Sequence, residues 1–168
     1  MSERLSLGVD IGGTKTAVGL VNETGAVVER LVVPTPKDSA ESLVAAIANA
    51  VRDLEQRQDA LEAGIGVAVA ALVDRTRGMV PFAAHLPLEQ VPFQVLIEQA
   101  PGRPVSVDND ATAAMSGEWA FGAAKGSTEC LMVSVGTGIG GGAVCGGLLQ
   151  RGAHGMAGEI GHQRFIPE

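Results

Sequence analysis

Two glycine-rich segments, each placed between apolar runs, constrain this chain more than any other feature. The first segment reads Val9-Asp-Ile-Gly-Gly-Thr-Lys15 and the second reads Val135-Gly-Thr-Gly-Ile-Gly-Gly-Gly142. Glycine accounts for 23 of the 168 residues, about twice its usual share of roughly 7%. Because glycine has no Cβ, such segments let the backbone turn tightly and approach a ligand closely. Each is therefore predicted to be a turn between two strands and a candidate ligand site.

The pattern of apolar residues predicts an α/β domain with a mixed sheet. An antiparallel meander of three short strands comes first, followed by a helix that starts with a capping-box-like pattern at Asp38 and Glu41. The continuous apolar run 64–73 predicts one strand buried on both faces. The expected strands are 5–11, 16–21, 27–33, 64–73, 104–107 and 129–135, with a further apolar stretch at 143–149. Further helices are expected within 88–100, interrupted by Pro92, and from Ala111 to near Gly122.

Composition excludes several classes of function. The chain has 12 Lys and Arg against 19 Asp and Glu, a net charge of −7, which argues against nucleic-acid or anionic-membrane surfaces. The longest apolar run is too short to cross a bilayer. Residues 1–7 carry two charges and no long apolar stretch, so we expect no signal peptide and a cytoplasmic location.

The first glycine segment suggests a phosphate site. Gly12, Gly13 and Thr14 in a tight hairpin leave several backbone N–H groups able to point at phosphate oxygens. Asp10, at the end of a strand, could hold magnesium through water, because nucleotide phosphates need a cation to offset their charge. An ordinary Gly-Gly hairpin is the alternative. The segment is not a P-loop, since Thr14 stands where that motif requires lysine.

The second glycine segment matches GxGxxG, the pattern of dinucleotide-binding folds. That motif requires a helix to begin at the glycines, and each glycine in a helix costs about 1 kcal/mol relative to alanine. A helix is therefore not expected, and a glycine-rich hairpin that grips phosphate fits better. The residues that would bind a nucleotide there are Gly136, Thr137, Gly138, Gly140 and Gly141.

Two further groups of residues could carry chemistry. Asp108, Asn109 and Asp110 end a predicted strand and open a helix, so one of them caps the helix, or Asp110 accepts a hydroxyl proton while Asn109 orients the same substrate. Glu159 and His162 lie in a glycine-flanked turn and could bind neighbouring sugar hydroxyls. A purely structural histidine is the alternative there. Zinc is a further option for His162, although no cysteine lies near it.

These segments, in this order, resemble the ROK family, which contains bacterial glucokinases, other sugar kinases and sugar-responsive repressors. The likeness covers essentially the whole chain and is strongest to the glucokinases. It implies an actin-like, ribonuclease H-like ATPase fold, with a mixed sheet and the beginning of a second domain. On that basis residues 1–120 would form the small domain and residues 121–168 the start of the larger one.

The resemblance also implies roles for individual residues. Asp10, Gly12, Gly13, Thr14 and Lys15 would form the first phosphate loop for ATP and Mg²⁺, and residues 136–141 the second. Asn109 would bind sugar hydroxyls, and Asp110 would be the base that activates the attacking hydroxyl. Glu159 and His162 would bind the sugar near its anomeric end, and His162 would also be a zinc ligand in members that carry the metal.

The chain departs from the family pattern at several positions. Ala70-Ala71 stands where members commonly have Pro-Gly or Ala-Gly, and Ala84-His85 stands where Pro-Asn is common. The sequence reaches Glu168 before the family's cysteine cluster, so we expect the N-terminal half of such a protein, without the zinc-binding cysteines and the usual homodimer surface.

The leading hypothesis is therefore ATP-dependent phosphorylation of a hexose, with glucose the expected substrate and glucose 6-phosphate the product. One alternative is a sugar-binding regulatory module without catalysis, and another is an inactive fragment. Repressors of the family carry a helix-turn-helix before the first glycine motif, whereas only residues 1–7 precede it here. DNA binding by this chain is accordingly not expected.

Overall fold

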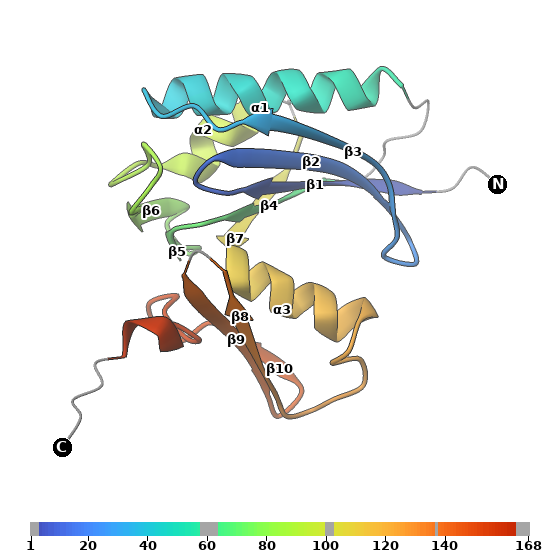
Figure 1. The fold of residues 1–168 in the computed structure, drawn as a ribbon, viewed down its shortest axis with the longest axis vertical. Coiled ribbons are helices and arrows are strands. Elements are labelled where there is room, and N and C mark those ends of the chain that lie inside the picture. The colour runs from blue at the N-terminus through green and yellow to red at the C-terminus, as the bar shows by residue number, and fades with distance from the viewer. Residues whose placement is uncertain (1–3, 58–63, 100–102, 137, 164–168) are drawn as a thin grey trace. The chain divides into compact units, whose positions relative to one another are not determined.

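A computed structural model describes residues 4–57, 64–99, 103–136 and 138–163 (Figure 1). The chain divides into two compact units, residues 1–110 and 111–168. This division falls ten positions before the boundary expected from the sequence, at residue 120. The assignment of residues 1–120 and 121–168 to two domains stays a prediction, and the two units are described separately below.

Unit 1 is built on a five-stranded mixed sheet, as the apolar pattern predicts. The strands are β1 (Leu5–Ile11), β2 (Lys15–Asn22), β3 (Val27–Pro34), β4 (Ile65–Val69) and β7 (Val105–Asn109), in the order β3-β2-β1-β4-β7. The first three strands pair antiparallel, whereas β4 pairs parallel to both β1 and β7. The carboxyl ends of β1, β4 and β7 therefore meet at the same edge of the sheet.

Two helices and one face of this sheet form the core of unit 1 (Figure 1). Helix α1 (Ala40–Glu55) buries Leu43, Ile47, Val51 and Leu54, which recur at helical spacing. Helix α2 (Phe93–Gln99) buries Phe93 and Ile97. Most of the remaining core residues come from the strands and include Leu7, Val9, Val18, Leu20, Val67 and Val107, while Leu86 and Leu88 come from the segment between β6 and α2.

The cap of α1 differs from the expectation. Ser39 is the N-cap residue, because its hydroxyl accepts a hydrogen bond from the backbone N–H of Ser42 at 3.1 Å. Asp38 instead accepts a hydrogen bond from the Ser42 hydroxyl. The capping-box interpretation with Asp38 and Glu41 was therefore one residue out of register.

The single strand expected over 64–73 is wrong. Strand β4 ends at Val69, where the Ala71 N–H donates to the Val69 carbonyl at 2.8 Å and turns the chain. A separate hairpin follows, formed by β5 (Leu72–Asp74) and β6 (Met79–Phe82). The sequence analysis did not predict β6, although Asp74, which accepts from two turn N–H groups, and Gly78, with φ of +64°, mark its turn. Helix α2 begins only after Pro92, which shortens the expected 88–100 helix.

Unit 2 combines a helix with a three-stranded antiparallel sheet. Helix α3 (Asp110–Phe121) begins at the last residue of unit 1 and leads into β8 (Cys130–Val135), β9 (Ile139–Cys145), β10 (Leu148–Gln150) and a 3₁₀ helix (Ile160–His162). The sheet order is β10-β9-β8. The apolar stretch at 143–149 is two strands, separated by a turn at Gly146 and Gly147 with positive φ. Met115 of α3 packs on one face of the sheet with Val144.

The opposite face of the unit 2 sheet is apolar and exposed. Leu131, Val133 and Val135 alternate along β8, and pairing places Val133 opposite Gly141 and Val135 opposite Ile139 on the same face. Val133 is 52% exposed and Val135 is 79% exposed. A strand that is apolar on both faces is typical of a sheet covered on both sides. The β8 part of this face is thus apolar and open to solvent, whereas the segment around Gly158 and Ile160 packs over Gly141 of β9.

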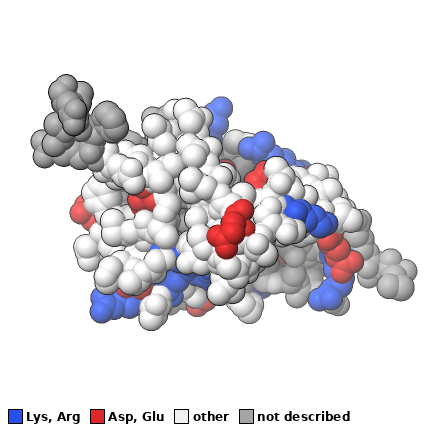
Figure 2. All heavy atoms as spheres, turned by 90° about the horizontal axis from the view of Figure 1, so that it is seen from below, with Lys and Arg blue, Asp and Glu red and all other residues white. Residues whose placement is uncertain are grey.

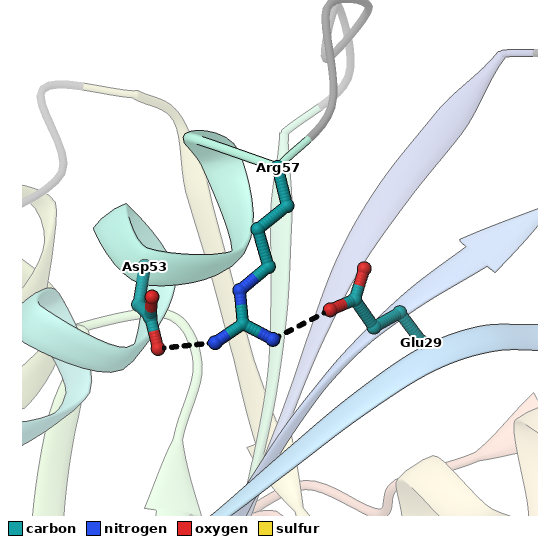
Figure 3. A network of polar contacts seen from close by, with 3 residues as sticks. All are labelled: Glu29, Asp53 and Arg57. Carbon is teal, nitrogen blue, oxygen red and sulfur yellow. Dashed lines mark hydrogen bonds and ion pairs between the residues drawn. The ribbon is translucent and has the colours of Figure 1, made fainter.

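A surface ion-pair network joins the end of α1 to β3 (Figure 3). The guanidinium of Arg57 contacts Glu29 and Asp53, each at 2.8 Å. Hydrogen bonds from these two carboxylates raise the pKa of Arg57 above its ordinary value. Since the network is exposed, it fixes local geometry more than it adds to stability.

Charge is sparse on the face of the molecule shown in Figure 2. Lys, Arg, Asp and Glu lie there in small groups of mixed sign, separated by uncharged surface. None of the helices in the described ranges is both long and apolar enough to cross a bilayer.

The exposed face of β8 generates a prediction about self-association. We expect Val133→Lys to reduce concentration-dependent association of the chain, because contiguous exposed apolar surface promotes protein–protein contact. Val95→Lys is the matched control: Val95 lies on α2 and is 51% exposed, against 52% for Val133. Sedimentation velocity over a concentration series measures the effect, and equal association of the two variants would contradict it.

Candidate active site

Three polar side chains from two distant segments of the sequence gather at the carboxyl edge of β1, β4 and β7. Asp10 precedes the last residue of β1, Asn109 is the last residue of β7, and Asp110 is the first residue of α3. No loop separates β7 from α3, so the helix start holds Asp110 directly at the strand end. In open α/β sheets this edge is where ligands bind.

The charge of Asp110 acts on Asp10 although the two residues lie one hundred positions apart. The pKa of Asp10 is raised, first by desolvation of its carboxyl group and then by repulsion from Asp110, while the Arg30 guanidinium opposes the rise. Asp10 as a whole residue is nevertheless exposed, so solvent and ligands can reach it. Two carboxylates that repel each other at a strand edge form a natural place for a cation.

Asn109 connects the residues at this edge of the sheet by hydrogen bonds. Its side chain is buried, and its amide nitrogen donates to the Ala71 carbonyl at 3.2 Å and to the Asp110 carboxylate at 3.1 Å. The segment that carries Ala71 is tied to β1 in turn, since the Ala70 N–H donates to the Ile11 carbonyl at 3.1 Å. The orientation of Asp110 is therefore set by a chain of hydrogen bonds that reaches β1.

The Ala70-Ala71 pair does not need glycine in this protein. Gln90 is the one non-glycine residue with positive φ among those the structure describes, so both alanines adopt ordinary backbone conformations. The family pattern with glycine at the second position is thus replaced by a turn that alanine can form, and the turn still supplies the carbonyl that Asn109 uses.

The first glycine segment is a tight turn between β1 and β2. The Gly12 N–H donates to the Lys15 carbonyl at 3.0 Å, and the Thr35 N–H donates to the Thr14 carbonyl at 3.0 Å. The buried Thr35 hydroxyl donates to the Gly12 carbonyl at 2.9 Å and lies 2.9 Å from the Thr16 hydroxyl. No local sequence signal marks Thr35 as a residue that hydrogen-bonds to a turn 23 positions earlier.

These hydrogen bonds occupy carbonyl groups of the turn but not all of its amide groups. Within the described part of the chain, no hydrogen bond occupies the N–H groups of Gly13 and Thr14. Successive unpaired backbone N–H groups in a turn attract anions such as phosphate. The turn therefore offers two amide donors to a ligand, and its role as a phosphate loop stays a prediction.

The second glycine segment, in unit 2, is shorter than expected. The turn between β8 and β9 spans only residues 136–138, and Thr137 lies outside the described residues. Gly140 and Gly141 lie within β9, not in the turn, which corrects the expected loop. A Cβ on Gly141 would approach the Gly158 carbonyl at 2.6 Å, and one on Gly140 would approach the Ala111 Cβ at 3.0 Å. Close packing accounts for glycine at both positions, and their part in nucleotide binding stays a prediction.

Glu159 and His162 are also in unit 2, at the 3₁₀ helix. His162 Nε2 lies 3.7 Å from the Glu159 carboxylate, and the His162 side chain is 78% exposed. Glycines flank both residues as the sequence predicts, but only His162 is exposed; the Glu159 side chain is 20% exposed. No group of three His, Cys, Asp or Glu side chains that could hold a metal ion occurs among the described residues. The residues present therefore do not fit a zinc site.

Magnesium has different requirements. It is held in proteins by one or two carboxylates together with substrate phosphates and water, not by a cage of protein groups. Asp10 and Asp110 supply two carboxylates whose repulsion a divalent cation would relieve. The residues at the edge of unit 1 fit a magnesium ion that binds together with phosphate.

The raised pKa of Asp10 predicts how stability depends on pH. Folding disfavours its charged form, so this residue's contribution to the free energy of unfolding falls as pH rises from the ordinary value of 3.8 through the folded value. Asp10→Asn removes the charge, and we expect it to stabilise the protein at about pH 7 and to lose that advantage at about pH 3.5. Urea denaturation at both pH values measures the effect, with Glu89→Gln as an exposed control. A destabilised Asp10→Asn protein at neutral pH would contradict the account.

Comparison of the chain with known proteins finds relatives by sequence and by structure. The chain is 43% identical over 164 residues to a glucokinase of Streptomyces coelicolor, a match that covers 98% of this chain and 51% of the relative. It is 37% identical over 99 residues to a xylose repressor of Caldicellulosiruptor bescii, covering 59% of this chain and 25% of that protein. The crystal structure of a ROK family glucokinase from Streptomyces griseus in complex with glucose and AMPPNP superposes with a TM-score of 0.88 at 42% identity, over 97% of this chain and 51% of the other.

The chain thus spans about half the length of the glucokinases it matches. The ROK family model matches residues 6–168, nearly the entire chain. The mixed sheet with its helices is the actin-like ATPase fold of that family, as the sequence motifs predict. The protein belongs to the ROK family.

Proposed function

We propose that this chain supplies the catalytic edge of a sugar kinase that transfers the terminal phosphoryl group of ATP to a hexose. The observation that carries the proposal is the convergence of Asp10, Asn109 and Asp110 beside a turn with unoccupied amide groups. The named glucokinase relatives, and the solved relative with glucose and AMPPNP, support glucose and ATP as the substrates.

In the proposed reaction Asp110 is the general base. Its carboxylate would accept the proton of the sugar hydroxyl as that oxygen attacks phosphorus. The start of α3 favours negative charge at this position. A carboxylate of ordinary acidity suffices, because the transition state of phosphoryl transfer is loose and the proton leaves late.

Asn109 would act in two ways. Its amide nitrogen holds the Asp110 carboxylate in place, as the 3.1 Å hydrogen bond shows. At the same edge, its side chain would contact the sugar hydroxyls that approach Asp110. In unit 2, Glu159 and His162 are proposed to bind the sugar near its anomeric end.

The phosphates would be bound by backbone amides. We infer that Gly12, Gly13 and Thr14, with Lys15, bind one part of the nucleotide. The turn at residues 136–138 in unit 2 would bind another part. Asp10 would hold magnesium through water, and the ion, when bound, would offset the negative charge of the phosphates. Amide groups fixed before the reaction supply stabilisation without further reorganisation.

A sugar-binding regulator without kinase activity is the second candidate, favoured by the similarity to a xylose repressor. In that case Asn109, Asp110, Glu159 and His162 would hold a sugar, and ATP would not change its affinity. Calorimetric titration of the chain with glucose, with and without ATP and magnesium, separates the two functions. A cytoplasmic location and the preference for glucose over other hexoses stay predictions.

Asp110→Asn tests the proposed base most sharply in a chimera, in which residues 1–168 replace the matched half of the Streptomyces coelicolor glucokinase. We expect hexose-dependent ADP release to fall by about a thousandfold or more, because the base is removed while the shape is kept. The hexose dissociation constant should change by less than about threefold.

Asp108→Asn is the control, since Asp108 lies two positions away and its carboxylate pairs with Arg75 at 3.2 Å. It should retain most of the activity of the chimera. Full activity of the Asp110→Asn chimera would refute the assignment of the base. An inactive parent chimera that still binds glucose would favour the regulator.

A further inference from the structure

Lys37 stands beside the first glycine turn without belonging to any motif. It follows β3 and precedes α1, and its ammonium group donates to the backbone carbonyl of His85 at 2.7 Å. The two residues are 48 positions apart in the sequence. This contact fixes where the end of an otherwise flexible side chain lies.

The ammonium group lies against the turn itself. A Cβ built on Gly13 would be 4.0 Å from Lys37 Nζ and 3.3 Å from the His85 Cβ. Glycine at this position therefore leaves bare backbone next to both side chains. A larger residue would press on His85 and separate the turn from the ammonium group.

The charge of Lys37 is not neutralised by the protein. Its partner is a neutral carbonyl, and no carboxylate lies within ion-pair distance of it in the parts of the chain that the structure describes. An ammonium group has three donors, so two remain after the bond to His85. The chain as a whole has a net charge of −7, so the positive charge of Lys37 beside unoccupied amide groups differs in sign from the protein overall.

Cation and amides together match one kind of ligand. The N–H groups of Gly13 and Thr14 offer donors from one side, and the Lys37 ammonium adds donors and charge from another. A phosphoryl group with several anionic oxygens can accept from both at once, whereas a neutral hydroxyl cannot use the charge. The carbonyl groups of Gly12 and Thr14 accept hydrogen bonds from Thr35. These acceptors of the turn are therefore held away from such a ligand.

We propose that Lys37 is a phosphate-binding residue of the first glycine turn, with its ammonium group on a phosphoryl group of a nucleoside triphosphate. This inference rests on the proposed function and names a residue that the family motifs do not contain. The His85 carbonyl acts as the positioning group that holds the ammonium in reach of the turn.

Calorimetric titration of the 168-residue chain with tripolyphosphate tests the proposal without needing sugar, adenine or turnover. We expect Lys37→Gln to weaken tripolyphosphate binding by about tenfold, because a charge-assisted contact is lost. Lys37→Arg should restore most of the affinity, and the dependence of binding on salt should be weaker in Lys37→Gln than in the unmodified chain. Lys125→Gln is the control: it removes the same charge from an exposed lysine of unit 2.

A second measurement keeps the test independent of how the variants fold. In the unmodified chain, tripolyphosphate should slow acetylation of Lys37 severalfold and leave acetylation of Lys125 unchanged, as read by peptide mass spectrometry. Binding that is equal in Lys37→Gln and the unmodified chain, with Lys37 unprotected, would overturn the inference and leave the proposed function in place. Failure of the unmodified chain to bind tripolyphosphate would overturn both this inference and the phosphate role of the first turn.

Discussion

The parallel pairing of β4 with β1 on one side and β7 on the other is the constraint on which the site depends. It brings the ends of three strands to one edge, so that a residue from the start of the sequence and two from much later meet there. The pairing is stabilised mainly by the apolar face beneath α1 and α2, with Val9, Val67 and Val107 in adjacent strands. The positions of the polar side chains at this edge thus depend on an apolar core that does not itself contact a ligand there.

Opposite charges are segregated at this edge. Asp10 and Asp110 repel each other and disfavour the ionised form of Asp10. The nearby turn presents amide groups and the ammonium of Lys37. A magnesium nucleotide carries both a cation and anionic oxygens, so it complements both parts at once, whereas a free sugar complements neither charge. This complementarity supports the proposed phosphoryl transfer over the alternative of sugar binding without catalysis.

Much of the fold could be predicted because its signals are local. Apolar runs and helical spacing marked β1, β2, β3, α1 and α3, and the order of the glycine and carboxylate motifs marked the family. Signals that depend on distant residues were not readable. The brace of Thr35 on Gly12, the carbonyl of Ala71 that fixes Asn109, and the approach of Lys37 to Gly13 each join segments far apart in the chain. The position of Gly140 and Gly141 within β9 was hidden for the same reason, since their close contacts are with α3 and the Gly158 segment.

The convergence of Asp10 and Asp110 at one strand edge beside the first turn is the central claim, and paramagnetic broadening by a cation bound there tests it directly. Manganese can replace magnesium at oxygen ligands and broadens amide resonances close to it. In a ¹⁵N-labelled chain with tripolyphosphate, substoichiometric Mn²⁺ should broaden two separate segments together, residues 10–14 and 109–111, before any other. Broadening that begins at exposed acidic residues such as Glu89, or that affects one of the two segments alone, would contradict the account.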